Sequence, residues 1–115
     1  MTAEEARKLS DAVQNRELEL KSKRLEKFKN SKQISKIIKR MGKLIAERAK
    51  NTNDRIFFYS LGNLRTLSED EMEYAKNEIL SHYKDRGFVA YISITNMYCR
   101  YDDIVISWKK QEGAV

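Results

Sequence analysis

Proline is absent from the 115 residues, and the sequence has one cysteine, one histidine and four glycines. Without proline, helices are not interrupted from within and a proline-rich linker cannot form. Because Cys99 is alone, one chain can build neither an intramolecular disulfide nor a thiolate metal site. His82 is distant from Cys99 in the sequence, and no glycine-rich phosphate loop is present. We therefore expect a protein that is not an enzyme and that holds no cofactor or metal.

Long apolar runs are also lacking. No stretch of about 18 apolar residues is present to span a bilayer, and residues 1–10 lack the apolar core of a secretory signal. Charged residues make up 35% of the chain and the mean hydropathy is −0.71, values that suit extended helices with wide solvated faces. We expect a cytosolic protein that does not bind a membrane.

The first helical segment is predicted close to the N-terminus. Thr2, followed three residues later by Glu5, is typical of a capping box, in which each side chain binds a backbone N–H near the start of a helix. We expect a short helix from residue 3 to about residue 13. Its apolar residues form one thin stripe, which is too little to stabilise an isolated helix.

A second, long helix is predicted from about Arg16 to Lys50, because its one glycine is Gly42 and most of its residues are good helix formers. The apolar stripes of its two halves are out of phase, and the polar residues 29–33 lie between them. The helix is therefore expected either to break near residues 29–33 or to turn its apolar face there. A helix of about 35 residues would be about 50 Å long. Its exposed part favours a homo-oligomer formed through the long amphipathic helix.

Turn-forming residues 51–54 separate this helical half from a half with strand signals. An apolar run predicts a buried strand over residues 55–60. A helix comes next, with a capping box formed by Ser68 and Glu71 and an end at Gly87. His82 falls near the last turn of this helix, where the helix dipole favours a partly cationic imidazole.

Two further strands are predicted over residues 88–95 and 104–108, because apolar residues alternate in both segments. The connecting residues form a hairpin with a loose or bulged turn. The predicted fold is therefore α+β, with a basic helical arm over residues 1–50 packed with a small β-α-β-β unit over residues 51–115. The unit has a three-stranded sheet with one helix on a face, and we expect one structural domain overall.

Positive charge is concentrated in one part of the chain. Residues 14–50 carry 13 Lys and Arg against four Glu, a net charge of +9, whereas residues 1–13 carry −1 and residues 51–115 carry −2. Such a helix can bind an anionic partner, including the phosphates of nucleic acid. Lysines dominate and aromatic residues are nearly missing, so nucleic-acid binding would be weakly specific. The alternative is a solvated face that keeps the protein soluble.

The candidate binding residues form two groups. The first group consists of cations in the middle of the basic helix, and the second of tyrosines and an arginine near strand ends, where rings and guanidinium groups can hold a base or a phosphate. Tyrosines at the edge of a small sheet also serve simply to cover its core, which is the alternative for the second group. The two groups are Lys36, Lys39, Arg40 and Lys43, and Tyr98, Arg100 and Tyr101.

Short motifs in the first ten residues and in about residues 55–108 resemble a known group of proteins. They are Met1-Thr-Ala-Glu-Glu-Ala-Arg-Lys-Leu-Ser10, Leu67-Ser68 at a helix start, Arg86-Gly87-Phe88, and Ile106-Ser107-Trp108. Together they look like small accessory proteins of large tailed bacteriophages, which are mostly of unassigned function. The resemblance implies a phage protein that acts in the host cytoplasm, where such proteins block a host enzyme, silence a defence system or sequester a signalling nucleotide. It implies no functional residues.

We therefore expect a non-catalytic, phage-encoded binding protein that inhibits or sequesters a host factor, in counter-defence or host takeover. Its target is either a host protein or an anionic small molecule such as a signalling nucleotide. One alternative is a basic protein that binds nucleic acid through its long helix. Another is a minor component of the virion or of its assembly.

Overall fold

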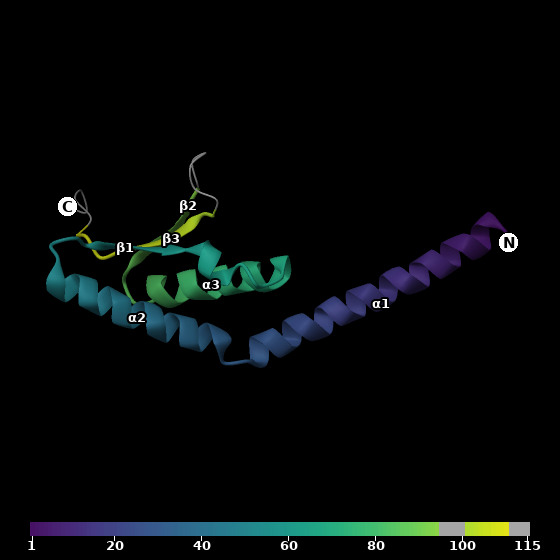
Figure 1. The fold of residues 1–115 in the computed structure, drawn as a ribbon, viewed down its shortest axis with the longest axis horizontal. Coiled ribbons are helices and arrows are strands. Elements are labelled where there is room, and N and C mark those ends of the chain that lie inside the picture. Colours follow the sequence, from purple (N-terminus) through teal and green to yellow (C-terminus); the bar gives the residue numbers. More distant parts are fainter. Residues whose placement is uncertain (95–100, 111–115) are drawn as a thin grey trace. The chain divides into compact units, whose positions relative to one another are not determined.

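The computed structural model describes residues 1–94 and 101–110, and the chain divides into two compact units, Met1–Lys32 and Gln33–Val115. The first unit consists of helix α1 (Ala3–Asn30). The second contains helix α2 (Gln33–Asn51), helix α3 (Glu69–Lys84) and a three-stranded sheet (Figure 1). The fold is α+β, as predicted. The boundary between the units falls at residue 32, so the second half of the predicted basic arm belongs with the sheet.

Helix α1 is a single continuous helix. The prediction of a short helix that ends near residue 13 is wrong, because α1 continues through Gln14 and Asn15 to residue 30. No proline or glycine stands in this stretch to stop it. The predicted cap is present, since the Thr2 hydroxyl accepts a hydrogen bond from the Glu5 amide at 3.2 Å. Every residue from 1 to 24 is exposed.

The break between α1 and α2 falls within the predicted residues 29–33. Ser31 is extended, with φ −77° and ψ 161°. Its hydroxyl donates to the Phe28 carbonyl at 2.6 Å, and its amide donates to the same carbonyl at 3.0 Å. A serine side chain that bonds nearby backbone in this way competes with continued helix formation. The basic stretch is therefore shared by two helices, with net charges of +2 in α1 (eight bases, six acids) and +5 in α2 (six bases, one acid).

The sheet has the order β1-β3-β2, with both pairs antiparallel. Its strands are β1 (Ile56–Ser60), β2 (Val89–Ser93) and β3 (Asp103–Ser107). The predicted pairing of the last two strands is confirmed. Strand β2 is shorter than the predicted residues 88–95, and β3 begins and ends one residue before the predicted residues 104–108. Strand β3 is central, and its residues Ile104, Val105 and Ile106 are 0% exposed. Among the described residues, the most strongly buried segment is thus a continuous apolar run, as expected of a strand covered on both faces.

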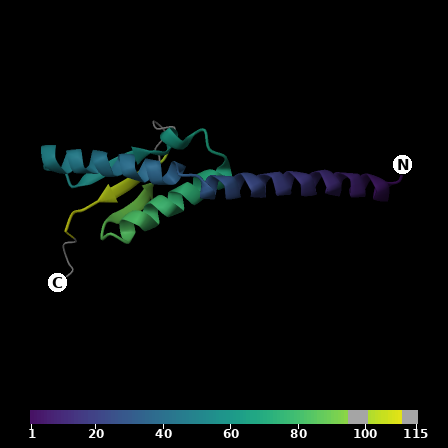
Figure 2. The ribbon, with the colours of Figure 1, turned by 90° about the horizontal axis from the view of Figure 1, so that it is seen from below.

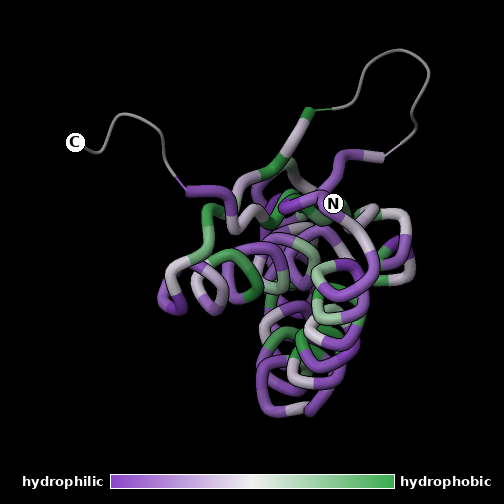
Figure 3. Tube along the Cα trace, turned by 90° about the vertical axis from the view of Figure 1, so that its left-hand side faces the viewer, coloured by the Kyte–Doolittle hydropathy of each residue, from purple (hydrophilic) through white to green (hydrophobic). Residues whose placement is uncertain are grey.

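Helices α2 and α3 lie side by side on one face of the sheet (Figures 1 and 2). Ala75, Ile79 and Tyr83 are the buried residues of α3. The Tyr83 hydroxyl donates to the Ile38 carbonyl of α2 at 3.2 Å, which ties the two helices together. In Figure 3 the helical turns carry hydrophilic stretches alternating with hydrophobic ones, as expected of helices with one apolar side.

Both ends of α3 are as predicted. Ser68 and Glu71 form a reciprocal capping box at its start. Gly87 has φ +89°, the left-handed conformation that favours glycine. The Gly87 amide donates to the Lys84 carbonyl at 3.1 Å and the Phe88 amide to the Tyr83 carbonyl at 3.0 Å, the two bonds of a Schellman motif. This turn leads the chain from α3 directly into β2.

Candidate binding site

One side of helix α2 lies against the edge strand β1. Residues at helical spacing, Ile34, Ile38, Met41 and Ile45, form the packed side of α2, and Met41 and Ile45 are buried. The neighbouring side of the helix, which carries Arg40, borders β1. Because β1 lies at the edge of the sheet, this side of α2 adjoins a strand with one unpaired margin.

A short 3-10 helix, η1 (Leu61–Leu64), comes directly after β1 and forms the end wall of this region. The Ser60 hydroxyl accepts from the Gly62 amide at 3.2 Å, and the Asn63 side-chain amide donates to the Ser60 carbonyl at 3.0 Å. Leu61 is held from the other side, since its amide donates to the Asp102 carbonyl at 2.9 Å. These bonds fix Asn63 and Leu64 opposite the first turns of α2.

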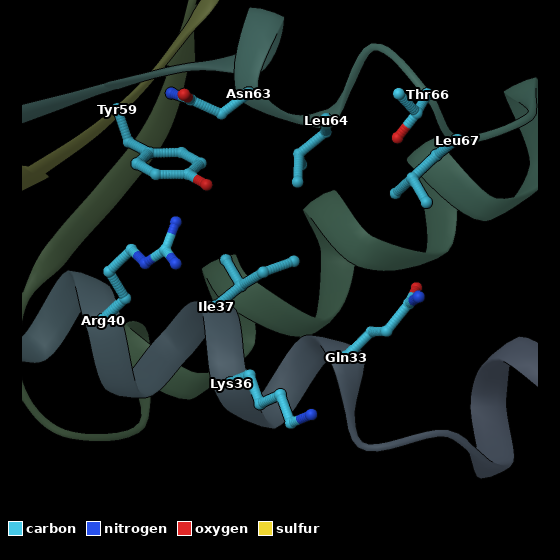
Figure 4. Close-up of a pocket in the computed structure, with 9 residues that line it drawn as sticks. All are labelled: Gln33, Lys36, Ile37, Arg40, Tyr59, Asn63, Leu64, Thr66 and Leu67. Atoms are coloured by element: carbon cyan, nitrogen blue, oxygen red, sulfur yellow. The ribbon is translucent and has the colours of Figure 1, made fainter.

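A cavity of about 270 Å³ lies between α2, β1 and η1, and we refer to it as the Arg40 cavity. Its apolar part consists of Ile37, Leu64 and Leu67 (Figure 4). Its polar part is supplied by the two cations Lys36 and Arg40 together with other side chains. The remaining lining residues are Gln33, Tyr59, Asn63 and Thr66.

The electrostatics of the Arg40 cavity favour an anion. Among the described residues that line it, two are cations and none is a carboxylate. Arg40 extends into the space below Tyr59, whereas Lys36 stands at the rim with its ammonium group directed away (Figure 4). Burial raises the pKa of the Tyr59 phenol, and the nearby Arg40 charge opposes this shift. Tyr59 is therefore protonated at neutral pH, and its hydroxyl can donate to an anion beside the guanidinium.

A second hollow, the Leu44 hollow, of about 300 Å³, lies further along the same side of α2. It is lined by Leu44 and Arg48 from α2 and by Phe57 from β1, with three further residues. Arg48 pairs with Asp54 at 3.1 Å between Nη2 and Oδ2, while its Nε is buried with no hydrogen-bond partner. The same side of α2 borders both the Arg40 cavity and the Leu44 hollow. From β1, Tyr59 lines the Arg40 cavity and Phe57 lines the Leu44 hollow.

The structure separates the predicted binding residues. Lys36 and Arg40 meet at the Arg40 cavity. Lys39 and Lys43 are exposed, and helical geometry places them on the side of α2 away from the packed residues. Tyr101 lies against η1 instead: a Cβ atom built on Gly62 would lie only 2.9 Å from its Cδ2. Tyr98 and Arg100 lie outside the described residues, so the grouping of the strand-end residues is not tested.

Sequence reasoning missed three polar residues of the Arg40 cavity, namely Gln33, Asn63 and Thr66. A signal for Asn63 exists, because Ser60 with Gly62 and Asn63 after it is typical of a turn in which side chains bond the backbone and fix the chain beyond a strand. Gln33 carries no such signal, because its position depends on the break at Ser31 and on the packing of α2.

Within residues 1–94 and 101–110, no three His, Cys, Asp or Glu side chains gather into a possible metal site. The helices in this described part of the chain are all too short or too polar to cross a membrane. Comparison with models of known protein families, with curated proteins and with solved structures gave no match. The Arg40 cavity therefore has to be interpreted from its own chemistry.

Proposed function

We propose that the chain is a non-catalytic binding protein that captures a partner protein through an acidic segment seated along α2 and β1. The observation that carries the proposal is the Arg40 cavity, which combines two cations and a protonated Tyr59 with an apolar floor. A carboxylate beside Arg40 would gain charge-assisted hydrogen bonds, and an adjoining apolar side chain would be covered by Ile37 and Leu64.

The size of the cavity supports a segment of a larger ligand over a whole small molecule. Binding sites for drug-sized molecules typically enclose about 300–1,000 Å³ and bury most of the ligand. The Arg40 cavity has about 270 Å³, so a complete dinucleotide would remain largely outside it. A single anionic group with a small apolar neighbour fits this volume, and the rest of the ligand then lies on the adjoining surface.

The position of the Leu44 hollow indicates that a bound segment would run along β1 from the Arg40 cavity. Tyr59 borders the Arg40 cavity and Phe57 borders the Leu44 hollow, two residues apart on the edge strand. Side chains two residues apart on an extended chain point the same way, about 7 Å from one another. An extended segment beside β1 would therefore present alternate side chains to the two hollows, a recurring mode of peptide recognition at sheet edges.

The biological setting of the proposal rests on the resemblance to small accessory proteins of tailed bacteriophages. In that setting the partner is a host protein that is inhibited or sequestered in the cytoplasm of the infected bacterium. We also propose that the chain acts as a homo-oligomer through α1, the element with the most exposed apolar residues.

The test uses the tagged full chain to capture proteins and small nucleotides from a bacterial lysate, followed by affinity measurement with the purified ligand. The double variant Lys36→Gln/Arg40→Gln should bind the captured protein at least about tenfold more weakly, because the charge-assisted hydrogen bonds of Arg40 and the cation at the rim of the cavity are lost. The matched control Lys39→Gln/Lys43→Gln removes the same charge from the exposed side of α2 and should change the affinity less than about twofold.

Two results would contradict this proposal. Equal losses in the two double variants would show that only the overall charge of α2 matters. If the captured ligand is a nucleotide whose affinity depends on Arg40, the Arg40 cavity is still the binding site, but the proposal of a partner protein is wrong.

A second candidate function, nucleic-acid binding, is favoured by a row of exposed lysines on α2. Lys39, Lys43 and Lys50 recur at helical spacing on the side away from the packed residues. Three phosphate contacts would give a slope of about −2 to −3 for log affinity against log salt concentration. In a gel-shift titration with duplex DNA, Lys39→Gln/Lys43→Gln should reduce this slope by about 2, whereas the first proposal expects no measurable complex at physiological salt.

A further inference from the structure

We infer that two copies of the chain pair through α1 in antiparallel orientation, so that the first half of one helix lies against the second half of the other. This inference rests on the proposed self-association and gives it a geometry. It is independent of what the Arg40 cavity binds. It is carried by exposed apolar residues, a surface hollow and a charge pattern, all within α1.

An apolar stripe runs along one side of the N-terminal two thirds of α1. Ala6, Leu9, Val13 and Leu20 recur at spacings of three, four and seven residues, which places them on one side of the helix. The larger three side chains are 58%, 49% and 56% exposed. Isolated helices are marginal in water, and most helical stability in proteins comes from packing of an apolar side. A second helix laid along this stripe would supply that packing.

The surface of α1 is hollowed on this stripe. The hollow is lined by Leu9, Ser10, Val13, Gln14 and Glu17. These residues lie one and two turns apart, the arrangement that forms a hole for the side chain of a facing helix in knobs-into-holes packing. Leu9 and Val13 supply its apolar part, so a leucine or valine of another helix is a suitable occupant. Leu20 of a second copy is such a side chain, because an antiparallel pair of helices over residues 3–30 sets it opposite Val13.

The charges of α1 decide the orientation. Residues 3–19 contain five acids and three bases, whereas residues 20–30 contain five bases and one acid. In a parallel pair, residues 20–30 of one copy, with a net charge of +4, would lie beside the same residues of the other copy. An antiparallel pair instead sets residues 20–30 of each copy beside residues 3–13 of the other, which carry a net charge of −1. It also opposes the two helix dipoles.

A single helix does not account for this pattern. Acids near the start and bases near the end of a helix are stabilised by its own dipole, but the effect is confined to the first and last turns. Lys21, Lys23 and Arg24 lie six or more residues before Asn30, beyond the last turn. Their position is explained by attraction to the acidic half of a second helix.

The first experiment measures mass by light scattering at low salt. The wild-type chain should have twice its 13.6 kDa. Val13→Asp should give the single-chain mass, because a carboxylate would be buried without a partner. Leu18→Asp is the matched control: Leu18 is 57% exposed but lies on the other side of α1, so this variant should keep the doubled mass. Circular dichroism of each variant reports whether α1 is still helical.

The second experiment measures orientation by the distance between spin labels in the dimer. A label is attached to Ala3→Cys in a Cys99→Ser background, so that each copy carries one label. The 28 residues of α1 span about 42 Å, so an antiparallel pair should give a distance above about 25 Å, whereas a parallel pair would give less than about 15 Å. A single-chain mass for the wild type overturns self-association itself, and a short distance overturns only the antiparallel geometry. Loss of the doubled mass in Leu18→Asp would contradict the proposal that the apolar stripe forms the contact between the two copies.

Discussion

The two units of this protein are helical for different reasons. In α1, residues 1–24 are all exposed, and the helix depends on its Thr2 cap, on good helix formers and on the absence of proline and glycine. In the unit from residue 33 onward, α2 and α3 each bury an apolar side against a sheet whose central strand has three fully buried residues, 104–106. The comparison teaches that local signals specify where α1 forms, whereas burial specifies how α2 and α3 are held.

The largest expected difference between the units concerns their apolar residues. Ile79→Ala removes a side chain that is 0% exposed in α3 and should lower the free energy of unfolding by about 2–5 kcal/mol. Leu18→Ala in α1 should change it by less than about 0.5 kcal/mol, because Leu18 is exposed. Urea unfolding followed by the fluorescence of Trp108, the one tryptophan, reports the sheet unit. Equal shifts from both variants would show that the two units unfold as one.

Two glycines test how far local preference matters inside the packed unit. Gly87→Ala places a side chain at φ +89° and should lower the free energy of unfolding by about 1–2 kcal/mol. Gly42→Ala lies within α2 with open space around its new Cβ atom, so it should raise the same free energy by about 1 kcal/mol. Thermal unfolding of both variants checks the signs. A loss of stability in Gly42→Ala would mean that α2 requires the glycine for another reason.

The helix caps give a matched pair across the two units. Ser68→Ala should lower the free energy of unfolding of the sheet unit by about 1 kcal/mol, because α3 loses its capping box. Thr2→Ala removes the corresponding bond in α1 and should reduce only the helical signal in far-ultraviolet circular dichroism. The Trp108 transition should be unchanged by Thr2→Ala. A shift in that transition would mean that the start of α1 contributes to the stability of the sheet unit.

The smallest expected effect is a pH dependence from His82. Burial lowers the pKa of His82, and the Arg86 charge lowers it further, against an opposing contribution from Asp85. Arg86 is held near the imidazole because its Nη1 donates to the His82 carbonyl at 2.9 Å. The expectation that the helix dipole favours a cationic imidazole is therefore wrong, because burial and Arg86 outweigh it.

The sign of the pH effect is set by this lowered pKa. The folded state favours the neutral imidazole of His82. The contribution of this residue to the free energy of unfolding is therefore complete above the ordinary pKa of about 6.5 and is lost as the pH falls below that value. Wild-type unfolding free energy should fall more between about pH 7 and pH 5.5 than that of His82→Gln. Parallel pH profiles for the two proteins would exclude a contribution from this residue.

Features of the fold that depend on neighbouring residues could be predicted from the sequence. Ser68 and Glu71 mark the start of α3 and Gly87 marks its end, because caps need only residues within one turn. The break near Ser31 is indicated by a polar interruption between two apolar stripes. The continuity of α1 is harder to predict because its thin, shifting stripe is equally typical of two helices, although no helix breaker separates them.

The candidate site was harder to predict because it joins distant parts of the chain. Lys36 and Arg40 could be selected by their charge, but the cavity beside them needs Tyr59 from β1 and Leu64 from η1. The position of α2 depends on contacts such as the hydrogen bond from Tyr83 to Ile38, 45 residues apart. Spacing along the sequence carries no information about such pairings. The same limit applies to Tyr101, whose packing against Gly62 no local pattern indicates.

The central position of β3 has a consequence for how the protein is made. Strands β1 and β2 are both complete before β3 is synthesised, yet in the sheet each pairs with β3. Until residue 107 has left the ribosome, β1 and β2 have no strand to pair with in the sheet. Helices α2 and α3 then lack the buried central strand on which they pack. Premature termination within β3 would therefore yield a product prone to aggregation or proteolysis rather than a smaller version of the same fold.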